Sequence, residues 1–130
     1  PSSAASDVYK RQTKLLLNCC LGKLNEEKIQ LNNKKSICIV LCSKGYPDKY
    51  DQNILIDGLS NLNLKKNEYI FHAGTKLEND QILSNGGRVL NFVSLSDNLK
   101  TSREELINLI ARLNWGNGFF RKDIGYKVID

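Results

Sequence analysis

The chain has few of the residues that form Cys/His metal sites, and it has no long apolar run. It contains no methionine and a single histidine, and its four cysteines have no C-x-x-C spacing. A Cys/His metal site is therefore not expected. The longest apolar run, Ile37 to Cys42, is too short for a transmembrane helix, and the first residues lack the apolar stretch of a signal peptide. We expect a cytoplasmic protein with no membrane partner and with buried, reduced cysteines.

The absence of methionine also means that no start residue lies within the 130 residues, so we expect a fragment of a longer protein. The opening "PSSAASDVYKRQ" is similar to translated sequencing-adapter read-through and shares no pattern with the rest of the chain. We expect residues 1–12 to be such an artefact and to lie outside the fold. The alternative, a short disordered tail, has the same consequence for the fold.

The charge is mildly positive and diffuse. The formal net charge is +5, and it falls to +4 without residues 1–12, which hold Lys10, Arg11 and Asp7. Lysine pairs at 34–35 and 65–66 lie in polar connections and form no stripe with interleaved aromatics. No nucleic acid is therefore expected as a partner, and a small anionic ligand fits better.

Periodicity predicts one globular domain after a leading helix. Apolar spacing predicts a helix over Lys14–Leu21, stopped by Gly22 and Lys23, within a leading segment 13–35. The continuous apolar run 37–42 is typical of a central strand buried on both faces. "NILIDGL" is too short to assign. "EYIFHAG" and "GRVLNFVSLSD" read as strands, joined by a turn at 78–80 and a short strand at 81–84 into an antiparallel meander.

After the strands the apolar period changes to that of a helix. We predict a helix from Leu99 to about Leu113, with Asn98 as its N-cap or with a capping box one turn later. The last residues, with Phe119 and Phe120 expected to be substantially buried, should fold back over the core. The fold class is α+β, a small antiparallel sheet with flanking helices.

The candidate binding site is the stretch "HAGTKLENDQILSNGGRVL", residues 72–90. If Lys76 and Arg88 lie on neighbouring strands joined through the 77–85 turn, their side chains converge. Gly86 and Gly87 then leave room for an anion between them. An arginine fork and a mobile lysine suit a phosphate. The alternative is a tight turn flanked by two solvated basic residues.

Four motifs carry a family resemblance: "LCSKGYP", "FHAGTK", "SNGGRVL" and "FFRKDIG". In this order they resemble the C-terminal part of the glycinamide ribonucleotide synthetase (phosphoribosylamine–glycine ligase) family, from about Leu15 to Asp130. The resemblance implies that residues 36–130 form the C-terminal domain of an ATP-grasp ligase of purine synthesis. That family uses ATP and Mg²⁺ to phosphorylate the glycine carboxylate. The amine of phosphoribosylamine then attacks, giving glycinamide ribonucleotide, ADP and phosphate.

The resemblance also implies where the chemistry lies. The family's metal-binding and nucleotide-binding segments precede Leu15, so this fragment holds no catalytic residue or metal ligand and should be inactive alone. Its partners are then the small-molecule substrates phosphoribosylamine, glycine and ATP, and the missing N-terminal and ATP-grasp domains of the same chain. By similarity, Lys76 and Arg88 hold the ribonucleotide 5′-phosphate, and Asn85, Gly86 and Gly87 shape the loop.

Several alternatives stay open at this point. His72, in one motif with Thr75, is either a ligand or a buried, hydrogen-bonded structural residue. The loop from Ser43 to Pro47 is a second candidate site or a tight turn. Residues 121–123, Arg-Lys-Asp, are expected to form an ion pair that anchors the tail. The chain as a whole is alternatively the C-terminal domain of another ATP-grasp ligase or biotin-dependent carboxylase, or a stand-alone basic domain that binds nucleic acid or protein.

Overall fold

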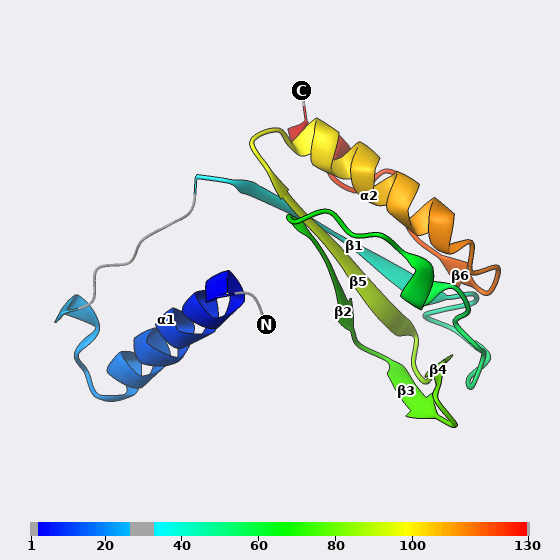
Figure 1. Ribbon diagram of the computed structural model, residues 1–130, viewed down its shortest axis with the longest axis horizontal. Helices are drawn as coiled ribbons and strands as arrows, with labels where there is room; N and C mark the ends of the chain where they lie inside the picture. The colour runs from blue at the N-terminus through cyan, green and yellow to red at the C-terminus, as the bar shows by residue number, and fades with distance from the viewer. Residues whose placement is uncertain (1–2, 27–32, 130) are drawn as a thin grey trace. The chain divides into compact units, whose positions relative to one another are not determined.

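The computed structural model describes residues 3–26 and 33–129. It consists of two units, Pro1–Asn32 and Asn33–Asp130 (Figure 1). The predicted boundary between residues 35 and 36 lies close to this division. Much of the predicted connection between them, residues 27–32, lies outside the described residues.

The first unit holds helix α1, Ser3–Cys20, and a 3₁₀ turn, η1, Leu24–Glu26. The predicted helix end is confirmed: Gly22 has φ of 69° and donates to the Cys19 carbonyl at 3.2 Å, and Lys23 donates to the Asn18 carbonyl at 2.8 Å. This hydrogen-bond pair is the Schellman arrangement that ends helices at a glycine. The predicted start is wrong, because the helix begins at Ser3. Residues 3–12 contain no proline or glycine and include strong helix formers, so they continue the helix.

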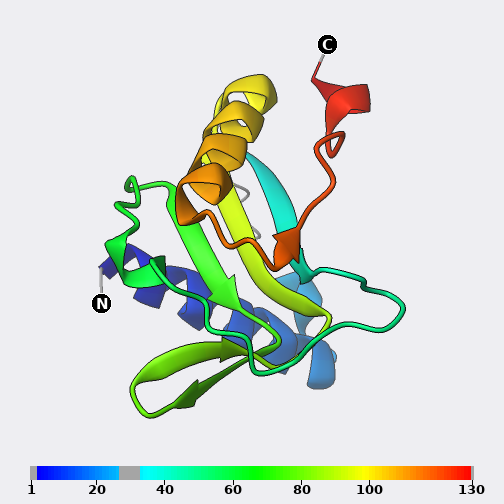
Figure 2. The same cartoon turned by 90° about the vertical axis from the view of Figure 1, so that its right-hand side faces the viewer.

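The second unit is built on a four-stranded antiparallel sheet in the order β2-β5-β1-β6. Helix α2, Leu99–Leu113, lies along one face of it (Figures 1 and 2). The α+β fold class is confirmed. The strands are β1, Lys35–Ser43; β2, Glu68–His72; β5, Arg88–Ser96; and β6, Gly118–Phe119.

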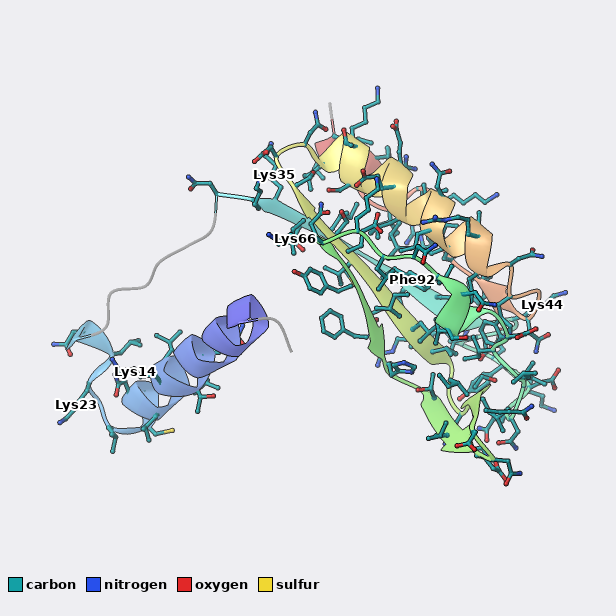
Figure 3. The ribbon with its side chains drawn as sticks, viewed as in Figure 1. Lys14, Lys23, Lys35, Lys44, Lys66 and Phe92 are labelled. Carbon is teal, nitrogen blue, oxygen red and sulfur yellow. The ribbon has the colours of Figure 1, made fainter. Side chains whose placement is uncertain are left out.

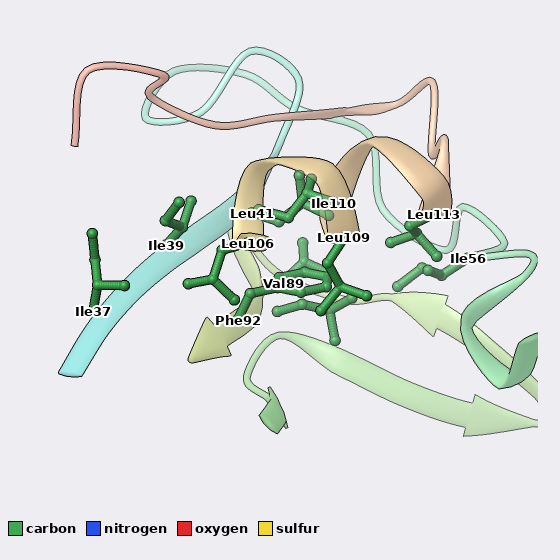
Figure 4. Packing of buried hydrophobic residues seen from close by; sticks show 11 residues of the cluster. Ile37, Ile39, Leu41, Ile56, Val89, Phe92, Leu106, Leu109, Ile110 and Leu113 are labelled. Atoms are coloured by element: carbon green, nitrogen blue, oxygen red, sulfur yellow. The ribbon is translucent and has the colours of Figure 1, made fainter. Parts of the chain in front are cut away.

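The core lies between this sheet and α2 (Figure 4). Strands β1 and β5 contribute one face each, and α2 contributes a stripe at helical spacing. Phe92 at the centre is fully buried beneath Leu106 and Leu109. The buried apolar residues are Ile37, Ile39, Leu41, Ile56, Val89, Leu90, Phe92, Leu106, Leu109, Ile110 and Leu113.

Helix α2 begins where the sequence predicts. The Asn98 side chain accepts hydrogen bonds from the backbone N–H groups of Lys100 at 2.8 Å and Thr101 at 3.3 Å. These bonds satisfy donors that have no partner within the helix. The helix ends at Leu113, and its C-cap residue Asn114 has a left-handed φ of 49°. Both predicted boundaries are therefore confirmed.

Strand β1 alternates between buried and accessible residues, so the prediction of burial on both faces is wrong. Ile37, Ile39 and Leu41 are buried against α2, whereas Cys38 is exposed and Val40 is half-buried. The same alternation on β2 and β5 leaves the far face of the sheet accessible. We call this the open face and define it by six residues: Cys38, Val40, Tyr69, Phe71, Asn91 and Val93.

The cysteines follow from this arrangement. All four are free thiols, as predicted, but Cys19, Cys20 and Cys38 are exposed, and Cys42 is half-buried. The expectation that they are buried is therefore wrong. An apolar strand predicts burial only where a second layer covers it, and no second layer formed by residues 33–129 covers this side of β1.

A separate hairpin takes the place of the predicted meander. Strands β3, Thr75–Glu78, and β4, Gln81–Ser84, form a two-stranded sheet apart from the main one, and Leu83 of β4 makes an isolated bridge with Leu55. The predicted turn is confirmed: Asn79 and Asp80 have φ of 50° and 58°, the left-handed pair of a type I′ hairpin. The unassigned segment 53–59 runs beside β4, with Ile56 donating to the Ile82 carbonyl at 2.8 Å.

The C-terminal tail does fold back, but its aromatic residues are less buried than expected. Phe119 is 38% exposed, whereas Phe120 packs against the core. Arg103 of α2 fixes the tail by donating to the carbonyls of Lys122 and, at 2.7 Å, Ile124. The short turn η3, Tyr126–Val128, follows.

Candidate functional site

Three segments meet at one end of the four-stranded sheet. They are the loop after β1, the β2–β3 connection and the loop before β5. Their backbones are joined by hydrogen bonds from Ser43 to Gly87 at 2.8 Å, from Gly74 to Arg88 at 2.8 Å, and from Asn85 to Gly74 at 2.7 Å. The buried Ser43 hydroxyl adds a bond to the Gly86 carbonyl at 2.8 Å. The loop before β5, residues 85–87, is therefore held on one side by Ser43 and on the other by Gly74.

The glycines at this junction allow close packing of the chain against itself. A Cβ on Gly74 would lie 2.7 Å from the Arg88 carbonyl oxygen and 2.8 Å from Gly86 Cα. A Cβ on Gly87 would lie 2.0 Å from the Tyr46 ring. These three distances are shorter than any normal contact, so neither Gly74 nor Gly87 can carry a side chain unless its neighbours move. A Cβ on Gly86 would likewise lie 3.1 Å from Gly74 Cα, so the glycine pair 86–87 has a structural reason that is independent of any ligand.

A bulge in β5 decides the side on which Arg88 lies. Leu41 pairs with Leu90, but the next residue of β1, Cys42, pairs with Arg88, so Val89 is the extra residue. Val89 and Leu90 are both buried, and Arg88 lies on the side of Cys42, away from α2. Bulges re-aim a side chain in this way.

A cavity of about 440 Å³ opens beside Arg88. Because Val40 and Asn91 contribute to its wall, it lies at one end of the open face. Gly74 and Gly87 supply backbone, and Tyr46 supplies a ring whose edge packs on Tyr50 at a centroid distance of 6.0 Å. The lining residues are Val40, Tyr46, Ala73, Gly74, Gly87, Arg88 and Asn91.

Arg88 makes this cavity cationic. Its guanidinium forms no hydrogen bond or ion pair with any residue in the described parts of the chain, and the side chain is exposed. Burial raises the pKa of the neighbouring Cys42 thiol, and the positive charge of Arg88 opposes that rise. An arginine with free donors beside an amide and a tyrosine can hold a phosphate or carboxylate through two parallel hydrogen bonds.

Lys76 does not share this cavity. It lies on β3, in the separate hairpin, where its ammonium forms an ion pair with Glu78. The prediction that Lys76 and Arg88 occupy neighbouring strands is therefore wrong, since β3 pairs with β4 and β5 lies in the other sheet. The roles of Lys76 and Asn85 as ligands stay predictions. Asn85 is exposed next to the cavity, and Gly86 contacts Gly74.

The other candidate residues lie around the junction, with His72 at the end of β2 and the Ser43–Pro47 segment at the end of β1. His72 is exposed and not buried, and its Nδ1 lies 2.9 Å from the Thr75 hydroxyl. The Ser43–Pro47 loop is a tight turn, in which Gly45 has φ of 96°, and it also supplies Tyr46 to the cavity. Its motif could have identified Tyr46. Nothing in the sequence distinguishes Asn91, because only its cross-strand position opposite Val40 brings it to the cavity.

The expected ion pair in the tail exists but does not anchor it. Arg121 and Asp123 form two hydrogen bonds, at 3.0 and 2.6 Å, within one exposed turn. The guanidinium lowers the pKa of the Asp123 carboxyl below its usual range. Both partners belong to the tail, so the contact to α2 comes from Arg103 instead.

Neither a metal cluster nor a membrane-spanning helix occurs in residues 3–26 and 33–129. No three His, Cys, Asp or Glu side chains of these residues gather closely enough to hold a metal ion. Within the same ranges, neither helix combines the length and the apolar character needed to cross a bilayer.

Comparison with known proteins identifies the family. The family described as phosphoribosylglycinamide synthetase, C domain, matches residues 36–127. A phosphoribosylamine–glycine ligase of Fusobacterium nucleatum is 39% identical over 112 residues, which are 85% of this chain and 26% of that protein. The ligase of Yersinia pestis is 38% identical over 127 residues, 94% of this chain and 29% of that protein.

A solved structure shows the same fold. The crystal structure of phosphoribosylamine–glycine ligase from Thermotoga maritima superposes with a TM-score of 0.62 at 23% identity. The match covers 83% of this chain and 27% of that one. The chain thus spans about a quarter of the length of the relatives that it matches. The match to residues 36–127 shows that the chain belongs to the phosphoribosylglycinamide synthetase C-domain family.

Proposed function

We propose that this chain is the C-terminal domain region of a cytoplasmic phosphoribosylamine–glycine ligase, and that its cavity holds the 5′-phosphate of phosphoribosylamine. The observation that carries the proposal is the Arg88 guanidinium, which lies at the cavity without a partner among the described residues. The Fusobacterium and Yersinia relatives bear this enzyme's name, and both are matched over most of this chain.

The form of the cavity supports a small phosphorylated ligand. Its volume of about 440 Å³ lies within the usual range for small-molecule sites, roughly 300 to 1,000 Å³. Gly74 and Gly87 present backbone to it, so part of the wall is rigid. Arg88 offers a planar fork to phosphate oxygens, and the Asn91 amide can bond a sugar hydroxyl.

Within this proposal the chain binds one substrate, and the longer protein performs the chemistry. ATP and Mg²⁺ would be held by the region that precedes this domain in the longer relatives, of which this chain covers about a quarter. The glycine carboxylate would be phosphorylated there by ATP. The amine of phosphoribosylamine, held by its 5′-phosphate in this cavity, would then attack the acyl phosphate and displace phosphate. The chain alone is expected to have no ligase activity.

Lys76 is proposed as a second phosphate contact. To reach the ligand it must leave Glu78, with which it forms a partly exposed ion pair. Pairs of this kind contribute only about 0 to 1 kcal/mol, so breaking the pair costs little.

The distribution of charge does not favour a nucleic-acid-binding domain. Lys35 and Lys66 lie at one end of the sheet and Lys44 lies at the other (Figure 3). A phosphate backbone needs cations along one continuous track. The family match likewise favours a purine-synthesis ligase over a biotin-dependent carboxylase.

The test is kinetic. Residues 33–130 replace the corresponding C-terminal domain of the Fusobacterium relative, and each substrate is varied in turn. Arg88→Ala is expected to reduce kcat/KM for phosphoribosylamine by about 10- to 150-fold, because a charge-assisted hydrogen bond contributes roughly 1.5 to 3 kcal/mol. Arg88→Lys should recover part of this loss, and Lys76→Ala should act in the same direction as Arg88→Ala.

Arg121→Ala is the matched control, since this exposed arginine pairs only within the tail. It should leave kcat/KM for all three substrates unchanged. KM for ATP and for glycine should not change in any variant. An inactive but folded chimera would contradict the enzyme assignment. An active chimera in which Arg88→Ala leaves kcat/KM for phosphoribosylamine unchanged would contradict the phosphate site alone.

A further inference from the structure

The open face of the sheet carries exposed aromatic side chains. Tyr69 and Phe71 are 39% and 47% exposed, and their rings stack at a centroid distance of 6.2 Å and an interplanar angle of 19°. Aromatic rings project from β2 on the side opposite α2 (Figure 3). Two large rings held together and left accessible are costly for a domain that works alone.

The strand register extends this surface across three strands. Tyr69 pairs with Val93, which pairs with Cys38 on its other side. Phe71 pairs in the same way with Asn91, and Asn91 with Val40. The six residues therefore form two parallel rows, of which five members are apolar or aromatic and none is charged. Such composition suits a buried protein contact and does not suit a nucleic acid or a charged peptide.

We propose that the open face is a domain interface, and that its occupant is the region preceding this domain in the longer family polypeptide. The chain spans 26% of the Fusobacterium relative and 27% of the Thermotoga structure, so most of those polypeptides lies outside the matched region. A domain separated from its neighbours leaves its former contact surface bare. The contact is independent of which ligand the cavity takes.

The cavity and the interface are continuous. Val40 and Asn91 belong to the open face and also line the cavity beside Arg88. An occupant that covers the two rows therefore reaches the cavity mouth and closes the side that is open in this domain. Docking excludes water from the neighbourhood of Arg88, and this strengthens its contact with an anion.

Cys38 is an exposed thiol within the open face, so its rate of reaction with maleimide shows whether the face is covered. The test uses variants in which the other three cysteines are serine. The rate of maleimide labelling is measured in the 130-residue chain and in a chimera that carries residues 13–130 behind the upstream region of the Fusobacterium relative. The expected result is at least tenfold slower labelling of Cys38 in the chimera.

The control is a thiol on the opposite side of the domain. Ala111→Cys, in a background with all four native cysteines replaced by serine, places it on the exposed side of α2. Its labelling should be equally fast in both proteins, which also shows that the chimera is folded and accessible. Equal rates for Cys38 in the two proteins would overturn the proposal.

A second measurement applies if the chimera does not fold. The purified upstream region is added to the 130-residue chain, and binding is measured by calorimetry. Phe71→Arg should weaken binding at least tenfold, whereas Leu77→Arg, an equally exposed change on the separate hairpin, should not. Equal binding by both variants, or no binding and no Cys38 protection, contradicts the proposal. Cys38 protection that rises with the concentration of the chain alone would instead assign the face to a second copy.

Discussion

Replacing Gly74 with alanine tests whether the three-segment junction determines the stability of the domain. The new methyl group would lie 2.7 Å from the Arg88 carbonyl oxygen, 2.8 Å from Gly86 Cα and 3.1 Å from Gly86 N. All three atoms belong to the backbone, so no side-chain rotation relieves the contact. The β2–β3 connection must therefore move away from the loop before β5.

The magnitude follows from the contacts that this movement breaks. Overpacking costs about 1 to 3 kcal/mol. The displacement also strains two backbone hydrogen bonds, Gly74 to Arg88 at 2.8 Å and Asn85 to Gly74 at 2.7 Å. Each contributes about 1 kcal/mol. We expect Gly74→Ala to lower the free energy of unfolding by roughly 2 to 5 kcal/mol in total.

The measurement is urea unfolding followed by circular dichroism, with Gly116→Ala as the control. A Cβ on Gly116 meets no atom within 4 Å, so that change should be neutral or slightly stabilising. Gly87→Ala provides a second comparison, because its contact is with the Tyr46 ring and should be relieved by Tyr46→Ala. If Gly74→Ala unfolds at the same urea concentration as Gly116→Ala, the close approach of the two backbones is not a constraint.

Three further predictions concern the helix cap and the tail. Asn98→Ala should lower the free energy of unfolding by about 1 kcal/mol through loss of the N-cap, and Asn98→Asp should preserve it, as urea unfolding would show. Arg103→Ala should release the tail, seen as faster hydrogen exchange after residue 120, while Arg112→Ala, on the exposed side of α2, should leave exchange unchanged. Because Arg121 lowers the pKa of Asp123, the stabilising pair is fully present above the carboxyl's unfolded pKa and is lost as pH falls through the lower folded pKa. NMR titration of Asp123 should show this low pKa, and Arg121→Gln should raise it; an unchanged value would contradict the pairing.

The sequence predicted those helix ends and turns that depend only on residues close by in the chain. The boundaries of α2 follow from one capping side chain and from the stripe that ends at Leu113, and both lie within the helix. The end of α1 follows from Gly22 in the same way. The Asn79–Asp80 hairpin needs only two residues that tolerate positive φ.

Features that depend on distant segments could not be read from the sequence. Apolar residues on both sides of β1 indicate that both faces can be buried, but a covering layer decides whether they are. The separation of β3 and β4 from the main sheet depends on the β2–β3 connection, where Gly74 meets the loop before β5. The residue pattern around Gly86 and Gly87 predicted Arg88 as an anion ligand, but only the fold places Tyr46 and Asn91 beside it.

The bulge at Val89 limits how this site can be recognised in other chains by alignment. In a regular strand, residues two apart share a face, so Arg88 would lie on the same side as Leu90, beneath α2. An unpaired guanidinium buried there would cost several kcal/mol. A homologous strand that keeps the same spacing but pairs regularly should therefore have replaced the arginine. An arginine conserved at this column identifies the same cation site only in those homologues whose strand also preserves the extra unpaired residue.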